Sequence, residues 1–109
     1  MVAKQIVKTG PVTINIKQRS VHVDGREVLV SGGEWKILRG LAKDAGMFRS
    51  TDELACLLYP KIRAGSISES ERRAVRITVA RLRRRIGVDE LIQTRPTMGY
   101  RILPMADRS

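Results

Sequence analysis

The stretch from Arg72 to Ile86 reads RRAVRITVARLRRRI, and its pattern predicts the amphipathic helix around which the chain is organised. Apolar residues recur at intervals of four, three and four, a spacing that places side chains on one face of an α-helix. We expect this face to pack on the core, and it consists of Val75, Val79, Leu82 and Ile86.

The opposite face of this helix is basic, with a stripe formed by Arg73, Ile77, Arg81 and Arg84. Seven arginines lie within the fifteen residues, and no acidic residue interrupts them. The major groove of B-DNA accommodates an α-helix, and arginine is well shaped to reach guanine edges and phosphates. We therefore interpret the stretch as a recognition helix; the alternative is a solvated basic face on an ordinary helix.

Length and composition favour a single globular domain over residues 1–109, with a core at about 10–103 and short tails at both ends. The chain is 42% hydrophobic and 29% charged, and its formal net charge of +10 favours a polyanionic partner. Residues 61–109 hold twelve Lys/Arg and five Asp/Glu, against nine and six in residues 1–60. The basic character therefore lies mainly in the half that contains the arginine helix.

Several classes of function are disfavoured by what the sequence lacks. The single cysteine, Cys56, and the single histidine, His22, leave no disulfide and too few ligands for a structural metal, so we expect neither metal nor cofactor. The sequence shows no nucleophile paired with a base, no pair of carboxylates typical of a pocket and no phosphate-binding glycine loop. We therefore do not expect an enzyme. No apolar run approaches membrane-spanning length, and the N-terminal residues do not have the apolar h-region of a signal peptide, so we expect a cytoplasmic, nucleoid-associated protein.

The segment before the helices has the alternation of short strands. Residues 4–30 predict three or four short antiparallel strands, which form a sheet with one solvent-exposed face. Turns are predicted at Gly10-Pro11 and Asp24-Gly25. We expect these strands to cover the helices and not to form a site themselves.

Two capping signatures predict two further helices. Ser31 with Glu34 opens a helix to about Ala45, and Ser50 with Glu53 opens a shorter helix to Tyr59. Gly40 lies inside the first helix, where a close crossing with another helix would explain it. The expected buried residues are Trp35, Leu38, Leu41 and Ala42 in the first helix, and Leu54, Leu57 and Leu58 in the second.

A loop and a hairpin flank the arginine helix. Lys61–Ser70 has loop composition, and the sequence alone leaves a partner contact and a plain connector equally open. After Gly87, the strands Leu91–Arg95 and Tyr100–Leu103 form a hairpin. Arg95 lies near its tip, where we favour entry into a DNA minor groove over a solvated turn residue.

In order and spacing, these motifs closely resemble the effector domains of OmpR/PhoB-type response regulators, over roughly residues 10–103. The residues that carry the resemblance are Val21-His22-Val23-Asp24-Gly25-Arg26, Val30-Ser31 with Glu34-Trp35, Gly46, Ser50, Leu54, Leu82-Arg83-Arg84-Arg85-Ile86, Ile92-Gln93-Thr94 and Gly99-Tyr100-Arg101.

The resemblance implies an α+β winged helix-turn-helix with an N-terminal antiparallel sheet, three helices and a C-terminal β-hairpin wing. It implies a bacterial transcription regulator that binds duplex DNA sequence-specifically, as a monomer in solution or a tandem dimer on DNA. By position, the DNA-binding residues would be Arg73, Arg76, Ile77, Thr78 and Arg81 in the major groove, Arg83 and Arg84 on phosphates, and Arg95 and Thr97 in the wing. The loop residues Lys61, Ile62, Arg63 and Ser66 would face RNA polymerase.

Three departures from the family pattern bear on function. Arg76 replaces the usual aspartate, so the preferred operator should differ. The wing reads Arg95-Pro96-Thr97 in place of Val-Arg-Gly, and a shift of one residue can move the arginine to the other face of its strand. No acidic cluster able to hold a phosphoryl group precedes residue 10, so we expect either an excised domain or a stand-alone regulator without a receiver domain.

Two other readings use the same fold. The exposed face with Ile77, Thr78 and Ala80 could dock on an acidic partner, which would make the chain a protein-interaction module, or the chain could bind the nucleoid non-specifically. The hypothesis of RNA binding has less support, because the chain has only four aromatic residues, and no two of them are clustered into a platform on which bases could stack.

Overall fold

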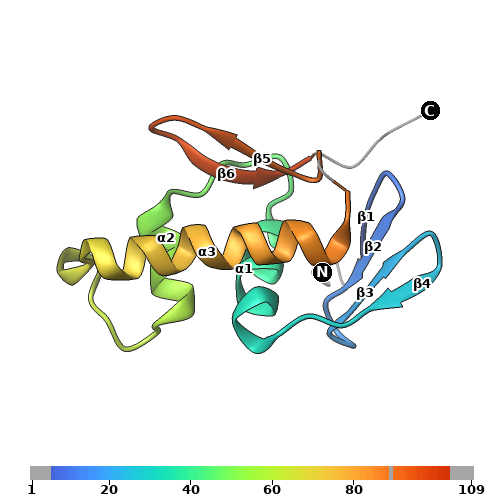
Figure 1. The fold of residues 1–109 in the computed structure, drawn as a ribbon, viewed down its shortest axis with the longest axis horizontal. Helices are drawn as coiled ribbons and strands as arrows, with labels where there is room; N and C mark the ends of the chain where they lie inside the picture. Colours follow the sequence, from blue (N-terminus) through green and yellow to red (C-terminus); the bar gives the residue numbers. More distant parts are fainter. Residues whose placement is uncertain (1–5, 89, 104–109) are drawn as a thin grey trace, which may run out of the picture.

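The computed structural model describes residues 6–88 and 90–103, so most of the predicted tails lie outside the described residues. The elements follow in the order β1 (Ile6–Thr9), β2 (Val12–Asn15), β3 (Ser20–Val23), β4 (Arg26–Val28), α1 (Gly32–Lys43), α2 (Thr51–Leu58), the single 3-10 turn η1 (Ala64–Ser66), α3 (Glu69–Ile86), β5 (Ile92–Arg95) and β6 (Gly99–Ile102) (Figure 1). This arrangement confirms the predicted α+β winged helix with its N-terminal sheet, three helices and C-terminal hairpin.

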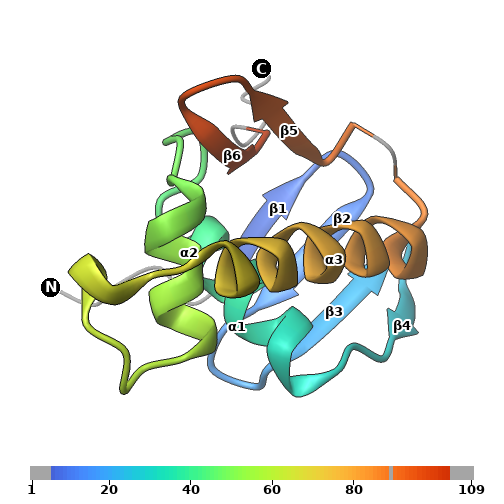
Figure 2. The ribbon, with the colours of Figure 1, turned by 60° about the vertical axis from the view of Figure 1, so that its left-hand side comes forward.

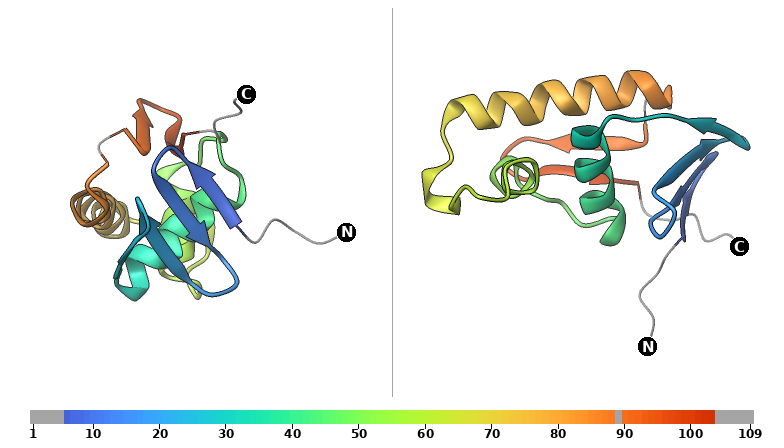
Figure 3. Two further views of the ribbon diagram at one scale, coloured as in Figure 1. Left: turned by 90° about the vertical axis from the view of Figure 1, so that its right-hand side faces the viewer. Right: turned by 90° about the horizontal axis from the view of Figure 1, so that it is seen from below.

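The N-terminal sheet has the strand order β1-β2-β3-β4, and every pair is antiparallel. Asp24 and Gly25 both adopt positive φ, 51° and 82°, as a two-residue hairpin with right-handed strand twist requires. Alternate residues face the core, and those that are buried are Val7, Thr9, Val12, Ile14, Val21 and Val23. The sheet lies beside the C-terminal half of α3 and covers that end of the helical layer (Figures 1 and 3).

Helix α3 runs along the surface and crosses both α1 and α2 (Figure 2). The predicted stripe is confirmed, because its four apolar side chains are all at most 3% exposed: Val75, Val79, Leu82 and Ile86. The helix begins at Glu69, three residues before the stretch Arg72–Ile86, because Ser68 is its N-cap and forms the first turn with Glu71. Their bonds run from the Ser68 backbone N–H and hydroxyl to the Glu71 carboxylate.

Two details of the shorter helices differ from the prediction. Helix α1 ends at Lys43 and not at Ala45. In α2, Leu54 and Ala55 face the core, whereas Leu57 is 38% exposed, which makes its predicted inward position wrong. A Cβ on Gly40 would lie 2.3 Å from Leu57 Cδ1. The close approach expected at Gly40 is therefore present, and the side chain that makes it is Leu57 at the edge of the α1–α2 contact.

The wing is hydrogen-bonded to the linker between α1 and α2. The Arg49 N–H donates to the Tyr100 carbonyl at 2.7 Å, and the Tyr100 N–H donates to the Arg49 carbonyl at 2.9 Å. One strand residue earlier, Gly99 has φ +104°, and a Cβ there would lie 2.0 Å from the Arg49 carbonyl oxygen. Only glycine allows both this backbone conformation and this contact.

Gly99→Ala should therefore detach the wing from the linker. We compare it with Gly87→Ala, because Gly87 also has positive φ but has open space where the Cβ would be. The control should lose about 1–2 kcal/mol of unfolding free energy from left-handed strain alone, and Gly99→Ala about 1–3 kcal/mol more from the clash. Urea unfolding of both variants measures the difference, and equal losses would show that the wing contact tolerates a side chain.

Candidate nucleic-acid interface

The side of α3 opposite the core is open to solvent over several turns. Its residues Arg73, Arg76, Ile77, Ala80, Arg81 and Arg84 are all exposed. Ile77 is 41% exposed and lies among the arginines as the single large apolar side chain of this stripe. Positions 73, 77 and 84 follow helical spacing, so a groove that receives the helix would meet them together. The predicted stripe is thus one continuous surface.

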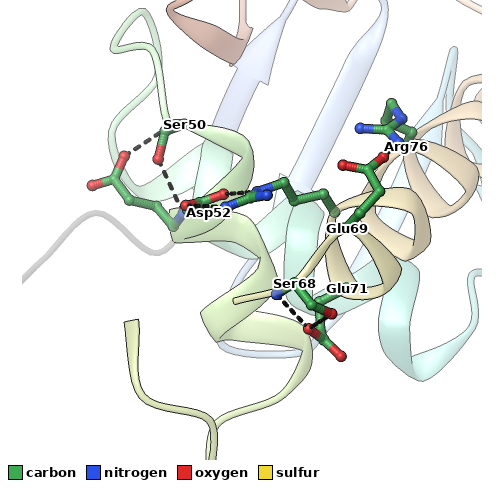
Figure 4. A network of polar contacts seen from close by, with 8 residues as sticks. Ser50, Asp52, Ser68, Glu69, Glu71 and Arg76 are labelled. Atoms are coloured by element: carbon green, nitrogen blue, oxygen red, sulfur yellow. Dashed lines mark hydrogen bonds and ion pairs between the residues drawn. The ribbon is translucent and has the colours of Figure 1, made fainter. Parts of the chain in front are cut away.

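The N-terminal end of α3 is fixed to α2 by an ion pair. Arg72 Nε donates to Asp52 Oδ1 at 2.8 Å, and Arg72 Nη2 lies 3.4 Å from Asp52 Oδ2 (Figure 4). Asp52 is in the first turn of α2, whose N-cap is Ser50 in a full capping box with Glu53. A two-point contact between a guanidinium and a carboxylate fixes orientation as well as distance. The pair therefore holds the start of α3 in register with α2.

The C-terminal end of α3 is fixed to α1 by a second ion pair. Arg85 Nε donates to Glu34 Oε1 at 2.6 Å, and the same oxygen accepts from the Ser31 backbone N–H at 2.9 Å. Glu34 is only 2% exposed, so its carboxylate depends on these partners for stabilisation. The capping box predicted from the sequence is confirmed, and its glutamate also binds the arginine helix.

The wing is joined to α3 by Arg83. Its Nη2 donates to the Ile92 carbonyl at 2.8 Å and to Thr94 Oγ1 at 2.6 Å. The side chain is half-buried, so its guanidinium is used inside the protein in this structure and does not point outward as a phosphate contact would. Thr78 is also half-buried, and its hydroxyl donates to the Ala74 carbonyl at 2.7 Å. Both predicted DNA contacts thus lie at the flanks of the exposed stripe.

Arg76 remains on the exposed surface. It forms an ion pair with Glu69, one helical repeat of seven residues earlier, and both side chains are largely in solvent (Figure 4). An exposed pair of this kind is weak and easily exchanged for another anion. The position is therefore available to a ligand.

The wing arginine lies on the face away from α3. Thr94 points to α3, whereas Arg95 lies on the other face with its Cζ 5.3 Å from the centre of the Phe48 ring. Arg101 stacks on the same ring at 4.7 Å. Thr97, at the tip, has φ +66°, which is uncommon for a β-branched residue and places strain in an exposed turn. The one-residue shift in the wing sequence therefore turns Arg95 toward Phe48.

The segment before α3 is more structured than its composition predicted. It contains η1, and Ile67 is buried at 8% exposure. Of the predicted partner residues, Lys61, Arg63 and Ser66 are exposed, whereas Ile62 is half-buried and packs against the core. The apolar residues at 62 and 67 were the signal for this anchoring.

The structure also reveals a surface that the sequence did not suggest. A groove of about 240 Å³ lies between the start of α2 and the wing, lined by Ser50 and Thr51 on one side and 94–100 on the other. It brings two half-buried hydroxyl-bearing residues, Ser50 and Thr51, beside the wing. Their place at a capping signature was the available signal.

Two further observations concern residues 6–88 and 90–103 only. No three His, Cys, Asp or Glu side chains come together there in a way that could hold a metal ion. None of the helices in that part combines the length and apolar character needed to cross a membrane.

The Asp52–Arg72 pair predicts an acid-sensitive contribution to stability. The hydrogen bond from Arg72 holds the pKa of Asp52 below its ordinary 3.8. The contribution is therefore full above that value and is lost as the pH falls through the lowered pKa of the folded state. Asp52→Asn should lower the urea midpoint at pH 7, and the difference from wild type should vanish well below pH 3.8.

A matched control for this measurement is Glu27→Gln on β4, because Glu27 forms no ion pair among the described residues. Its midpoint difference should change much less with pH. A constant difference between Asp52→Asn and wild type at all pH values would show that the carboxylate acts through packing and not through its charge.

The comparisons with known proteins agree with this geometry. The chain matches the family described as "Transcriptional regulatory protein, C terminal" over residues 25–102. It is 25% identical over 85 residues to the cell cycle transcriptional regulator CtrA of Caulobacter vibrioides, covering 78% of this chain and 35% of CtrA. It is 28% identical over 97 residues to the transcriptional regulatory protein CutR of Streptomyces coelicolor, covering 89% and 42%. The chain thus spans less than half the length of these curated relatives.

Solved structures have the same fold. The DNA-binding domain of Klebsiella pneumoniae RstA in complex with the RstA box superposes with a TM-score of 0.75 at 26% identity, covering 93% of this chain and 99% of that one. The DNA-binding domain of CpxR from E. coli has a TM-score of 0.72 at 20% identity, covering 94% and 100%, and supports the fold alone. With most of its length matched and a winged-helix fold, the chain belongs to the family of C-terminal DNA-binding domains of OmpR/PhoB-type transcriptional regulatory proteins.

Proposed function

We propose that this chain recognises a short site in duplex DNA by placing the exposed stripe of α3 in the major groove. The observation that carries the proposal is this stripe itself, four exposed arginines around Ile77 on a helix whose other face is buried. Arginine reads guanine through two parallel hydrogen bonds, and an aliphatic side chain suits a thymine methyl group. The RstA DNA-binding domain, which has the same fold, was solved in complex with the RstA box, and this supports DNA binding by the present chain.

The arginines would divide the work of binding. Arg73, Arg76 and Arg81 would read base edges together with Ile77 and Thr78, and Arg84 would hold a phosphate. Arg83 would act indirectly, because its bonds to the wing fix the angle between wing and helix. Arg76 would read a guanine where an aspartate at this position would accept from cytosine.

The wing would lie near the minor groove with Thr97 at its tip. Arg95 would reach the backbone only by leaving Phe48, which makes its contribution smaller than that of the helix. Contact with DNA would bring the protein to the nucleoid, and two copies would bind in tandem, each on one half-site.

Selection of bound duplexes from a random pool at near-physiological salt tests the proposal. We expect a compact motif, repeated about one helical turn apart if two copies bind in tandem. Arg76→Asp should change the preference at one base pair and leave the rest of the motif intact. A featureless pool with salt-sensitive binding would instead favour a non-specific nucleoid binder, and no DNA binding would favour an interaction module.

Single substitutions separate base reading from phosphate binding. Arg81→Ala should cost about 1–3 kcal/mol of binding free energy and relax preference at one position. Arg84→Ala should weaken binding to all sequences alike and reduce the salt slope by about one. Arg39→Ala removes the same charge from the exposed face of α1 and serves as control. Titration of the selected duplex and its single-base variants measures these effects, and identical sequence-independent losses at both positions would contradict the division.

We also propose that the segment 61–66 faces RNA polymerase. Its cations Lys61 and Arg63 are exposed, and Ile67 beside it is buried, so the segment is presented on a fixed support. Charge reversal of both cations should reduce co-purification of polymerase on operator DNA and leave DNA affinity within about twofold. Unchanged polymerase recruitment would refute this role.

A further inference from the structure

A second basic surface lies outside the DNA-binding stripe. A groove of about 650 Å³ opens between α1, the edge of α2 and the turn that joins β2 to β3. Its basic lining consists of Lys17 and Arg19 from the turn and Lys36 and Arg39 from α1. A smaller groove of about 140 Å³ continues along α1 and adds the cations Lys43 and Arg49 and the carboxylate of Glu53. We call this surface the α1 groove.

The α1 groove faces away from α3. Glu34 points to α3, because it is bonded to Arg85. Lys36 is two residues further along α1, which corresponds to a turn of about 200° around the helix axis. Arg39 and Lys43 follow Lys36 at intervals of three and four, so all three lie on the same face. A straight duplex seated on α3 therefore leaves the groove open to another partner.

Most of the positive charge of the α1 groove has no carboxylate partner among the described residues. On α3, Arg72, Arg76 and Arg85 each pair with a carboxylate. Six cations line the two grooves in the described part of the chain: Arg49 is paired with Asp44 and Glu53, and the other five form no ion pair. The one carboxylate in the lining, Glu53, lies 3.7 Å from Arg49 and belongs to that pair. Five like charges around a hollow create a positive potential that favours an anionic ligand.

The lining is also partly apolar. Ile16, Trp35 and Leu57 line the same groove, and Leu57 is the α2 residue that faces solvent where a core position was expected. A phosphate backbone has no apolar groups to bury against the aliphatic and indole surface of a groove. A protein segment, in contrast, buries apolar side chains in such a groove and surrounds them with polar contacts. The combination indicates a ligand with both carboxylates and apolar groups.

We propose that the α1 groove binds an acidic segment of a partner protein, in which Asp and Glu side chains flank at least one large apolar side chain. The carboxylates would meet the cations of the turn and of α1, and the apolar side chain would lie against Trp35 and Leu57. A second copy of this chain is a poor occupant, because at a net charge of +10 the two copies repel each other. The proposal uses none of the exposed arginines of α3 and is independent of how the chain reads DNA.

The test uses the full chain and a fluorescein-labelled twelve-residue peptide that contains six Asp/Glu and three Leu. Binding is followed by anisotropy at about 0.1 M salt, where exposed charges more than a Debye length apart are largely screened. The variant Lys36→Glu/Arg39→Glu should bind the peptide at least about tenfold more weakly. The matched control Arg73→Glu/Arg81→Glu makes the same change in net charge on α3 and should alter peptide affinity less than about threefold. All four side chains are exposed, so both variants should fold.

Binding of the duplex selected from the random pool is measured on the same two proteins. Here the α3 variant should lose DNA affinity and the α1 variant should keep it. Equal loss of peptide binding in both variants would mean attraction to total charge and would overturn the proposal. A loss of DNA binding in the α1 variant as large as in the α3 variant would make the groove a DNA contact and would also overturn it. Failure of peptide binding with intact DNA binding would refute the groove and leave the proposed function standing.

A second peptide tests the apolar half of the proposal. Replacing its three leucines by serine keeps every charge and should weaken binding by about tenfold or more, in proportion to the apolar surface that is no longer buried. Backbone amide shifts on adding the leucine peptide should map to residues 16–19, 32–39 and 57. Unchanged affinity of the serine peptide, or shifts confined to α3, would refute the assigned site.

Discussion

The structure depends on the burial of one apolar stripe along α3. Seven arginines on a single helix repel one another, and like charges one turn apart destabilise an isolated helix. Burial of Val75, Val79, Leu82 and Ile86 against the other helices opposes this repulsion, since each fully buried aliphatic side chain contributes about 1.5–3 kcal/mol. The same stripe fixes the rotation of the helix about its axis. Because the aliphatic residues occupy the core-facing side of the helix, the arginines of the opposite side face solvent.

The arginines of α3 then divide by what surrounds them. Arg72, Arg83 and Arg85 are used within the protein, and each holds a different neighbour: α2, the wing and α1. These contacts fix the angle between helix and wing before any ligand arrives, so little ordering is left to oppose binding. Arg73, Arg81 and Arg84, in contrast, have no such contact in the described part of the chain. In the proposed function these three arginines bind DNA, and the ion pairs and hydrogen bonds of their neighbours would hold the helix in place while they do so.

The positive charge of this protein is therefore distributed over two surfaces that differ in shape and in apolar content. On α3 it is arranged along a helix of a width that suits a DNA groove. On the opposite side, the cations of α1 and the β2–β3 turn surround a hollow with apolar lining, a geometry that suits an acidic protein segment. With both proposed surfaces occupied, the domain would hold DNA and a protein at the same time.

The sequence by itself determined the strands and the three α-helices, their order and the family. Helical period identified the buried stripe of α3, the pairs Ser31–Glu34 and Ser50–Glu53 marked the helix starts, and Asp24-Gly25 marked a hairpin, because each signal acts within a few residues. The tertiary structure alone decided which arginines are free. Arg85 forms an ion pair with Glu34, 51 residues earlier in the chain, and Arg83 donates hydrogen bonds to the wing. Arg95 lies over the ring of Phe48, and Leu57 is exposed and lines the α1 groove. A side chain's partner depends on distances between elements, and those distances are set only when the apolar faces pack together.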